Sequence, residues 1–346
     1  MTSFAVVGAG WRAEMFWRLG AALDGLECLG AVVRTPRALP VRTFASLAEV
    51  RPDFVVTAVP WPANPHVIAD AVHRGLPVLA ETPPAPDLAG LRALWADVGD
   101  STAVQVAEQY RLVPAHAARL AAVRAGAVGT PTQVQVSSTH LYHAVSLIRG
   151  FLDAGRTPVT VRATRTMAPL VGPLTRAGWT GDDTPHPATT TIATLDLGGE
   201  RSGLYDFTDN QWHNQLRFRR LLVRGTHGEL RDDEVVRLVG PATIARTPLV
   251  RRQTGYDLDL DGYDTDHITL GDAVLFRNPY PGRRLNDEEI AISTLLAAMA
   301  AWVRGDGPPP YPLADGMHDH QVALAIGAAA DADAPVTTTR EPWTAQ

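Results

Sequence analysis

The chain has 346 residues, of which 45% are apolar and 20% are charged, a composition typical of a folded protein with more than one domain. Its formal net charge is -6, so it lacks the general basic field with which proteins bind nucleic acid or an anionic membrane surface. Small molecules are therefore the expected partners.

The cysteine and lysine content restricts the chemistry further. Cys28 is the only cysteine, so no internal disulfide can form, which suits a reducing cytosol. The N-terminal segment does not resemble a signal peptide, and no apolar run approaches the roughly 20 residues that span a bilayer. We therefore expect a cytoplasmic protein. The sequence contains no lysine, so all 31 cationic side chains are arginine and none can act as a lysine proton donor.

The first third of the chain alternates predicted strands with predicted helices. Short apolar strands separated by helices indicate a parallel sheet covered on both faces, because parallel neighbours need crossover connections. The sequence thus predicts a doubly wound α/β domain over residues 1–113. The expected strands are 4–7, 26–33, 53–59, 76–80 and 102–107, and the expected helices are 11–23, 66–75 and 87–98.

A glycine motif connects the first predicted strand to the first predicted helix. The stretch from Gly8 to Ala13, GAGWRA, fits G-x-G-x-x-[GA]. Gly8 permits a tight turn, Gly10 lets a pyrophosphate approach the backbone, and the small Ala13 lets helix and strand pack closely. The positive end of the helix attracts the anion. We therefore predict that Gly8, Gly10, Trp11, Arg12 and Ala13 bind a dinucleotide; the alternative is a tight turn without a ligand.

The end of the second predicted strand bears on the choice of cofactor. Sites that prefer NAD usually have an acidic residue here, which holds the ribose 2′-hydroxyl. This chain has Arg34, Thr35, Pro36 and Arg37 instead. Arginine and a hydroxyl suit a 2′-phosphate, so NADP is favoured over NAD; the alternative is a solvated basic turn.

After residue 113 the pattern changes to strands with one wet face. A helix is expected over 114–125, and then polar and apolar residues alternate in segments that begin at Thr132, Val159, Thr189, Ser202 and Arg217. Such alternation without intervening helices predicts an open, mainly antiparallel sheet in an α+β domain over 114–346.

Two helices are expected near the end of the chain. Asn286 followed by Glu289 predicts a capping box before a helix over 290–303, and a second helix is expected over 314–330.

Several segments in this order resemble the Gfo/Idh/MocA family of NAD(P)-dependent sugar and polyol oxidoreductases over nearly the whole chain. They are VVGAGWRA, DFVVTAVPWPANPHVIADAVHRGLPVLAETPPAP, EQYRLVPAHAARLAAVRAGAVGTPTQV, LLVRGTHGEL and the two closing helices. The resemblance implies a Rossmann domain and an open sheet that supplies a substrate cleft and a homodimer or homotetramer interface. It also implies that Pro60, His66, Glu81 and Thr82 lie beside the cofactor.

The chain departs from the family pattern at its proton-transfer residues. The family usually has Glu-Lys-Pro where this chain has Glu81, Thr82 and Pro83, and its Asp-x-x-x-His pattern falls here on Thr139 and His143. A threonine hydroxyl can orient or relay but cannot replace the lysine, whereas a histidine can transfer a proton near neutral pH. We therefore predict His143 as the acid/base, with His140 and Tyr142 as rivals; the alternative is that His143 only packs or caps its helix.

Other polar residues give weaker indications. Arg111 could reach cofactor or substrate oxygen or form a surface salt bridge at the domain junction, and Trp212 with His213 could line a sugar cleft or an intersubunit contact. The acidic run from Asp257 lacks the glutamate of a calcium loop, because Ile268 occupies that place. His318 and His320 are interpreted as solvated, and no metal site is predicted.

Three functions remain open from the sequence. The favoured one is hydride transfer between a nicotinamide cofactor and a sugar, cyclitol or related hydroxy compound. The second is a catalytically silent dinucleotide-binding sensor or partner protein, suggested by the loss of lysine and aspartate. The third is transient oxidation of a sugar carbon that assists elimination or glycoside cleavage and returns the cofactor unchanged.

Overall fold

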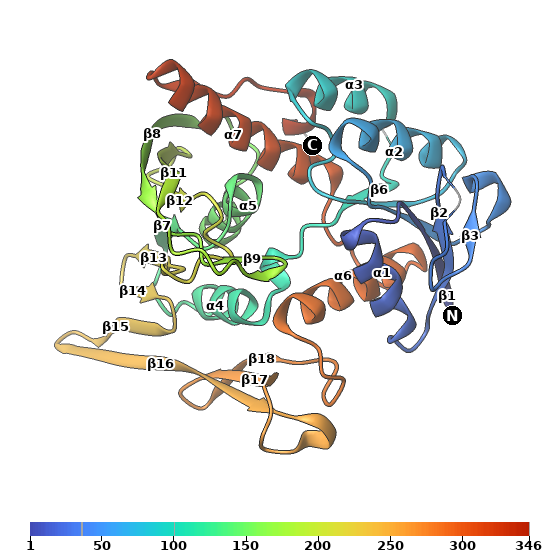
Figure 1. Ribbon diagram of the computed structural model, residues 1–346. Helices are drawn as coiled ribbons and strands as arrows, with labels where there is room; N and C mark the ends of the chain where they lie inside the picture. Colours follow the sequence, from blue (N-terminus) through green and yellow to red (C-terminus); the bar gives the residue numbers. More distant parts are fainter. Residues whose placement is uncertain (36, 100, 346) are drawn as a thin grey trace.

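The computed structural model describes residues 1–35, 37–99 and 101–345. Figure 1 shows a parallel sheet with its helices, formed by the N-terminal third, beside a larger sheet formed mainly by the middle of the chain. Two helices from the C-terminal part, α6 (Asp287–Val303) and α7 (Leu313–Ala332), pack against elements of both halves.

The first sheet has six parallel strands in the order β3-β2-β1-β4-β5-β6. The prediction of a doubly wound parallel sheet is therefore confirmed. Because the strand order reverses between β1 and β4, the carboxyl ends of these strands form the crevice where such sheets bind ligands. The elements are β1 (Thr2–Val7), α1 (Trp11–Ala21), β2 (Leu26–Val32), β3 (Thr43–Phe44), β4 (Phe54–Thr57), α2 (Asn64–His73), β5 (Val78–Ala80), α3 (Leu88–Val98) and β6 (Val104–Val106).

The second sheet has eleven strands in the order β18-β17-β16-β15-β14-β13-β7-β12-β11-β8-β19. Only the pair β12 and β7 is parallel, so the prediction of a mainly antiparallel sheet is confirmed. Its strands are β7 (Pro131–Val136), β8 (Thr160–Leu170), β11 (His186–Asp196), β12 (Ser202–Thr208), β13 (Leu221–Gly225), β14 (Gly228–Arg231), β15 (Glu234–Gly240), β16 (Thr243–Thr254), β17 (Asp264–Leu270), β18 (Ala273–Arg277) and β19 (Val336–Thr337). A separate small hairpin consists of β9 (Leu174–Thr175) and β10 (Gly178–Trp179).

Helix α6 begins with the predicted capping box. The Asn286 Oδ1 accepts the Glu289 backbone N–H at 3.0 Å, and the Glu289 Oε2 accepts the Asn286 N–H at 2.9 Å. Ile290 and Met299 of this helix are fully buried in one cluster with Phe16 of α1. Residues far beyond position 113 thus complete the packing of the parallel-sheet half.

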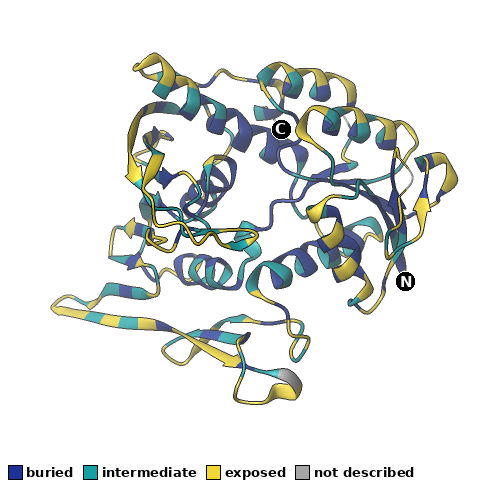
Figure 2. Cartoon of the chain, viewed as in Figure 1, coloured by how far each residue is buried: buried dark blue, intermediate teal, exposed yellow. Residues whose placement is uncertain are grey.

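Helix α5 (Leu141–Leu152) is the most enclosed helix in Figure 2, lying between the large sheet and α7. The helix α4 (Pro114–Arg124) packs beside it. On α7, His318, Asp319 and His320 are all buried. The interpretation of His318 and His320 as solvated is therefore wrong, because the face of α7 that holds these side chains packs on α5 and the Rossmann half rather than facing water.

Within residues 1–35, 37–99 and 101–345, no helix combines the length and apolar character needed to cross a bilayer. The same residues contain no group of three or more histidine, cysteine and acidic side chains arranged to hold a metal ion.

Candidate active site

The glycine turn has the backbone geometry that a pyrophosphate site requires. Gly8 has φ +125°, and a Cβ at this position would lie 2.1 Å from the carbonyl oxygen of Ala58. Gly10 is the N-cap of α1 and no side chain caps the helix there. A Cβ on Gly10 would meet nothing within 4 Å, so the space before the free N–H groups of α1 is open. This turn therefore fits the phosphates of a dinucleotide.

Three predicted cofactor residues follow this turn. Ala13 is fully buried, as its packing role requires, and Trp11 is 41% exposed at the first position of α1. Arg12 lies in the interior of the crevice, where its guanidinium pairs with Glu81 at 3.3 Å and with Glu288 at 3.0 Å. Its charge is thus already matched by two carboxylates.

The loop after β5 is held by polar contacts to its backbone. The Asn64 side chain donates to the carbonyl oxygens of Glu81 and Pro83 at 2.9 and 3.1 Å, and its own oxygen accepts from Thr57 at 2.6 Å. Thr82 is buried and is joined to Pro83 by a cis peptide bond. Burial raises the pKa of the Glu81 carboxyl, although Arg12 and His143 act in the opposite direction.

The other predicted cofactor residues lie on the surface of the parallel-sheet half. Pro60 precedes α2, and His66 is on its first turns; both are exposed. Arg34 and Thr35 are exposed after β2, while Pro36 lies outside the described residues. Arg37 donates to the carbonyl oxygen of Ala9 at 3.3 Å, which brings this basic turn next to the glycine turn.

His143 forms a buried pair with Glu108. The His143 Nδ1 lies 2.6 Å from the Glu108 Oε2, and the Glu108 side chain is fully buried. The other carboxyl oxygen of Glu108 accepts the backbone N–H of Tyr110 at 2.9 Å, and the Tyr110 ring stacks on His143 at 4.3 Å. Because a carboxylate can only accept, Nδ1 carries a proton and Nε2 is the basic nitrogen.

The two rivals of His143 have different surroundings. His140 is the N-cap residue of α5 rather than part of the helix, and its ring lies 5.3 Å from that of His143 and 4.9 Å from that of Trp212. Burial, and then His143, lowers the pKa of His140 to about 4. Burial raises the pKa of Tyr142 well above its ordinary value, so its hydroxyl stays protonated.

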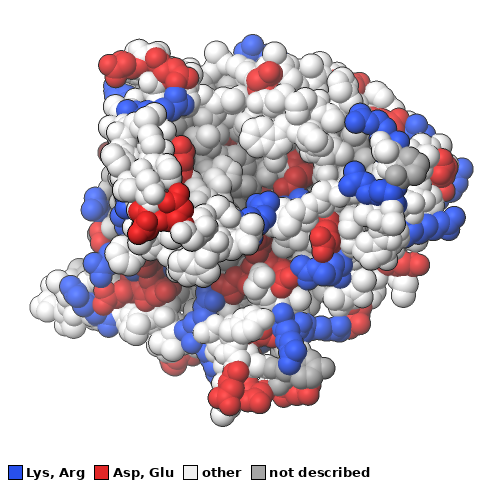
Figure 3. Space-filling model, in the orientation of Figure 1, with Lys and Arg blue, Asp and Glu red and all other residues white. Residues whose placement is uncertain are grey.

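One cavity of about 740 Å³ is lined both by the start of α1 and by residues around His143. It is lined by Trp11 and Arg12 at the start of α1, by the N-cap residue His140 and by His143 of α5, but not by Tyr142. The face drawn in Figure 3 is hollowed near its centre, and arginine and carboxylate atoms meet along this hollow. Six arginines line the cavity: Arg12, Arg119, Arg176, Arg219, Arg220 and Arg251.

Four of these arginines are paired with carboxylates. Besides Arg12, Arg119 pairs with Asp233 at 2.9 Å, Arg220 with Asp206 at 2.5 Å and Arg251 with Asp287 at 2.7 Å. Among the residues that the structure describes, no carboxylate pairs with Arg176 or Arg219.

The predicted substrate residues divide into two groups. Trp212 and His213 line the cavity. Arg111 instead points into the interior, where it donates to the Ser146 carbonyl oxygen at 3.0 and 2.6 Å and lies over the Tyr311 ring. Arg111 therefore neither lines the cavity nor forms a surface salt bridge, because its N–H groups donate to the backbone of α5.

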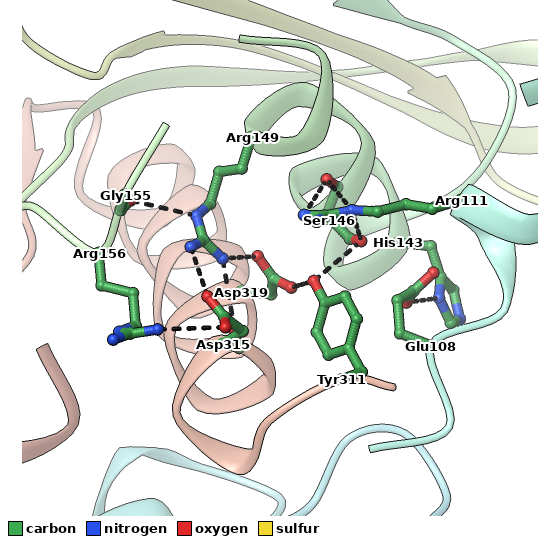
Figure 4. A network of polar contacts seen from close by, with 10 residues as sticks. All are labelled: Glu108, Arg111, His143, Ser146, Arg149, Gly155, Arg156, Tyr311, Asp315 and Asp319. Atoms are coloured by element: carbon green, nitrogen blue, oxygen red, sulfur yellow. Dashed lines mark hydrogen bonds and ion pairs between the residues drawn. The ribbon is translucent and has the colours of Figure 1, made fainter. Parts of the chain in front are cut away.

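A polar network continues from Arg111 through α5 to α7 (Figure 4). Ser146 contacts the Tyr311 hydroxyl at 3.1 Å, and that hydroxyl donates to Asp319. Asp319 also pairs with Arg149 at 2.5 Å, and both side chains are almost wholly buried. The network fixes the position of α5, the helix that carries His143.

Sequence reasoning missed Glu108 and most of the cavity arginines. Glu108 follows β6, at the carboxyl edge of the parallel sheet where ligand sites form, and this position was the signal that could have found it. No comparable signal marks Arg176 and Arg219, because they come from a hairpin and a loop of the other half.

No protein-family model matches this sequence, and no curated protein matches it. Solved structures share its fold. A myo-inositol dehydrogenase from Corynebacterium glutamicum is 20% identical with a TM-score of 0.66, covering 99% of this chain and 100% of its own. An oxidoreductase from Agrobacterium radiobacter, in complex with NAD+, L-tartaric acid and magnesium, is 15% identical with a TM-score of 0.68, covering 97% and 98%. The WlbA dehydrogenase from Bordetella pertussis, in complex with NADH and UDP-GlcNAcA, is 17% identical with a TM-score of 0.64, covering 98% of both chains. This chain therefore has the two-domain fold of these dehydrogenases.

Proposed function

We propose that this protein is an NAD(P)-dependent oxidoreductase that transfers a hydride between nicotinamide and a hydroxyl-bearing carbon of a sugar, cyclitol or related compound. The observation that carries the proposal is the cavity lined both by Trp11 and Arg12, which follow the glycine turn at the start of α1, and by His143. A dinucleotide held at the turn and an acid/base group on α5 would both face one substrate. The solved dehydrogenases of the same fold support this reading.

The bound cofactor would supply the hydride chemistry. The free N–H groups at the start of α1 and the open space at Gly10 would hold its phosphates. We further propose that Arg34, Thr35 and Arg37 favour NADP, because guanidinium and hydroxyl groups suit a 2′-phosphate better than a free ribose. The contact of Arg37 with the glycine turn supports this part.

His143 moves the hydroxyl proton in this proposal. Its Nε2 accepts the proton as the substrate carbon loses hydride, and Glu108 keeps Nδ1 protonated and stabilises the imidazolium that forms. The Tyr110 ring limits rotation of the imidazole. Thr82, in the place of the family lysine, has no group that can take this proton, so the Glu108–His143 pair replaces the lysine.

Cofactor binding and turnover test the proposal separately. The affinities for NADH and NADPH are measured by titrating each nucleotide into the protein and recording tryptophan fluorescence. Reduction or oxidation of the cofactor is then followed with a panel of sugars and cyclitols. We expect binding of both nucleotides, tighter for NADPH, and turnover with at least one compound. Tighter binding of NADH would contradict the NADP preference, and binding without any turnover would favour the silent sensor.

Variants test the role of His143. His143→Ala is expected to lower turnover by roughly 10²–10⁴-fold with little change in cofactor affinity, because the proton then has no acceptor. Glu108→Gln should lower kcat and change its pH profile. The exposed His227→Ala is the control, since His227 lies outside the cavity and should not matter. If His143→Ala retained full activity while His140→Ala lost it, the rival would replace His143.

A further inference from the structure

Arg176 and Arg219 differ from the other arginines of the cavity. The remaining four are paired with carboxylates of the protein, as described above, and their charges are matched. For the residues that the structure describes, no ion pair joins Arg176 or Arg219 to an acidic side chain. Two positive charges therefore face the cavity without an acidic partner among the residues that the structure describes.

Both guanidinium groups are nevertheless held in place. The guanidinium of Arg176 lies 3.7 Å from the centre of the Trp11 ring, a cation–π contact with the first residue of α1. Arg219 donates to the carbonyl oxygen of Trp212 at 2.5 Å. These contacts fix the two side chains without neutralising them.

The turn over residues 209–214 supports both arginines. The Asn210 side chain donates to the Leu174 carbonyl oxygen at 3.0 Å and the Asn214 side chain donates to that of Val171 at 2.8 Å, which anchors the β9–β10 hairpin that presents Arg176. The Gln211 side chain donates to the Phe218 carbonyl oxygen at 2.9 Å, next to Arg219.

The histidines in this region experience the same positive field. Desolvation, followed by Arg176 and Arg219, lowers the pKa of His213. Burial, followed by Arg119 and Arg219, lowers the pKa of His116 to about 3. Both histidines line the cavity. Arg176 and Arg219 thus act on neighbouring side chains as positive charges, while Glu288 acts on His213 in the opposite direction.

We propose that Arg176 and Arg219 bind an anionic group of the substrate, a carboxylate or a phosphate, so that the enzyme acts on a sugar acid or sugar phosphate rather than on a neutral polyol. The proposal rests on the proposed function and names its substrate class. A guanidinium offers paired N–H donors that match either anion. The hydroxyl to be oxidised would then face His143, which lines the same cavity.

Matched compounds provide the test. A hexose, the corresponding hexuronate and the corresponding hexose 6-phosphate are compared as substrates, and each is titrated by calorimetry in the presence of NADH. We expect one of the two anions to exceed the neutral hexose by at least roughly tenfold in kcat/KM and in affinity, because hydrogen bonds to charged groups are strong. The two anionic compounds distinguish carboxylate from phosphate.

Substitutions locate the effect. Arg176→Gln and Arg219→Gln should each reduce the preference for the anion over the neutral hexose by roughly tenfold and leave the Kd for NADH and NADPH unchanged. Arg217→Gln is the matched control, because Arg217 lies on the same loop as Arg219 but does not line the cavity. Equal preference for the neutral hexose, or unchanged selectivity in both variants, overturns the proposal.

Two further outcomes distinguish an anion of the substrate from the phosphates of the cofactor, and failure of this proposal from failure of the proposed function. If Arg176→Gln weakened NADH binding as much as it weakened anion binding, the guanidinium would serve the cofactor phosphates and the substrate proposal would be wrong. If the protein bound neither nucleotide, the proposed function would fail first. Titration of the hexuronate and the phosphate into the protein alone would then show whether the two arginines still bind an anion, and absence of binding would reject the anion site as well.

Discussion

Arginines lie in two contrasting regions of this protein, the interface between α5 and α7 and the end of the cavity near the β9–β10 hairpin. At the interface, Arg149 is buried and paired with Asp319 and Asp315, and Arg111 is satisfied by Ser146. At the cavity, Arg176 and Arg219 are exposed, and within the described part of the chain their partners are the Trp11 ring and the Trp212 carbonyl oxygen.

The difference shows how burial separates structural from ligand-directed charges. A buried charge without a partner costs several kcal/mol, so the chain must supply Asp319 to Arg149 itself. An exposed guanidinium is solvated and can remain unpaired at little cost until a ligand arrives. The two regions should therefore respond differently to the same kind of substitution.

The largest effect on stability is expected at the buried interface. Asp319→Ala leaves the Arg149 charge buried with one partly exposed partner, Asp315, and also removes the acceptor of the Tyr311 hydroxyl. We expect a loss of about 3–5 kcal/mol in the free energy of unfolding, measured by urea denaturation. The control is Asp331→Asn, which breaks the exposed pair with Arg165 and should cost under about 1 kcal/mol. Similar losses in both variants would remove the contrast between the regions.

The pH dependence of stability gives an effect of intermediate size. His116 has a pKa of about 3 in the folded protein, lowered by burial first and then by Arg119, against an ordinary value of 6.5. Between these two pKa values, His116 is protonated in the unfolded chain but not in the folded protein. The free energy of unfolding therefore decreases as the pH falls from 6.5 toward 3. The contribution of one histidine to this slope is about 1.4 kcal/mol per pH unit. His116→Gln should reduce the slope of the free energy of unfolding against pH, measured between pH 6 and pH 4, roughly the middle of the range between the two pKa values. An unchanged slope would contradict the lowered pKa of His116.

The smallest effect on stability is expected from substitution of the two cavity arginines that lack an acidic partner. Arg176→Gln and Arg219→Gln should change the free energy of unfolding by less than about 0.5 kcal/mol, because neither side chain completes a buried ion pair. Urea denaturation without ligand checks this value. Destabilisation of several kcal/mol would mean that these arginines are structural, and it would weaken the case that their charge is reserved for a substrate.

The candidate site was only partly predictable from the sequence. Gly8, Gly10 and Ala13 could be identified because the turn they form depends on neighbours in the chain. His143 could be singled out only through the family pattern, and nothing local to it indicated Glu108, which lies 35 residues earlier. Arg111 was expected at the cavity or surface, but its direction depends on the packing of α5, which the sequence does not reveal.

By itself, the sequence determined the alternation of strands and helices, the glycine turn, the capping box at Asn286 and the absence of lysine. These features follow from side-chain periodicity and from interactions between residues close together in the chain. Tertiary structure alone decided which charges are paired, that His318 and His320 are buried, and that Trp11, His143, Arg176 and Arg219 share one cavity. These outcomes depend on contacts between elements far apart in the chain, where burial and distance fix the energy of each charge.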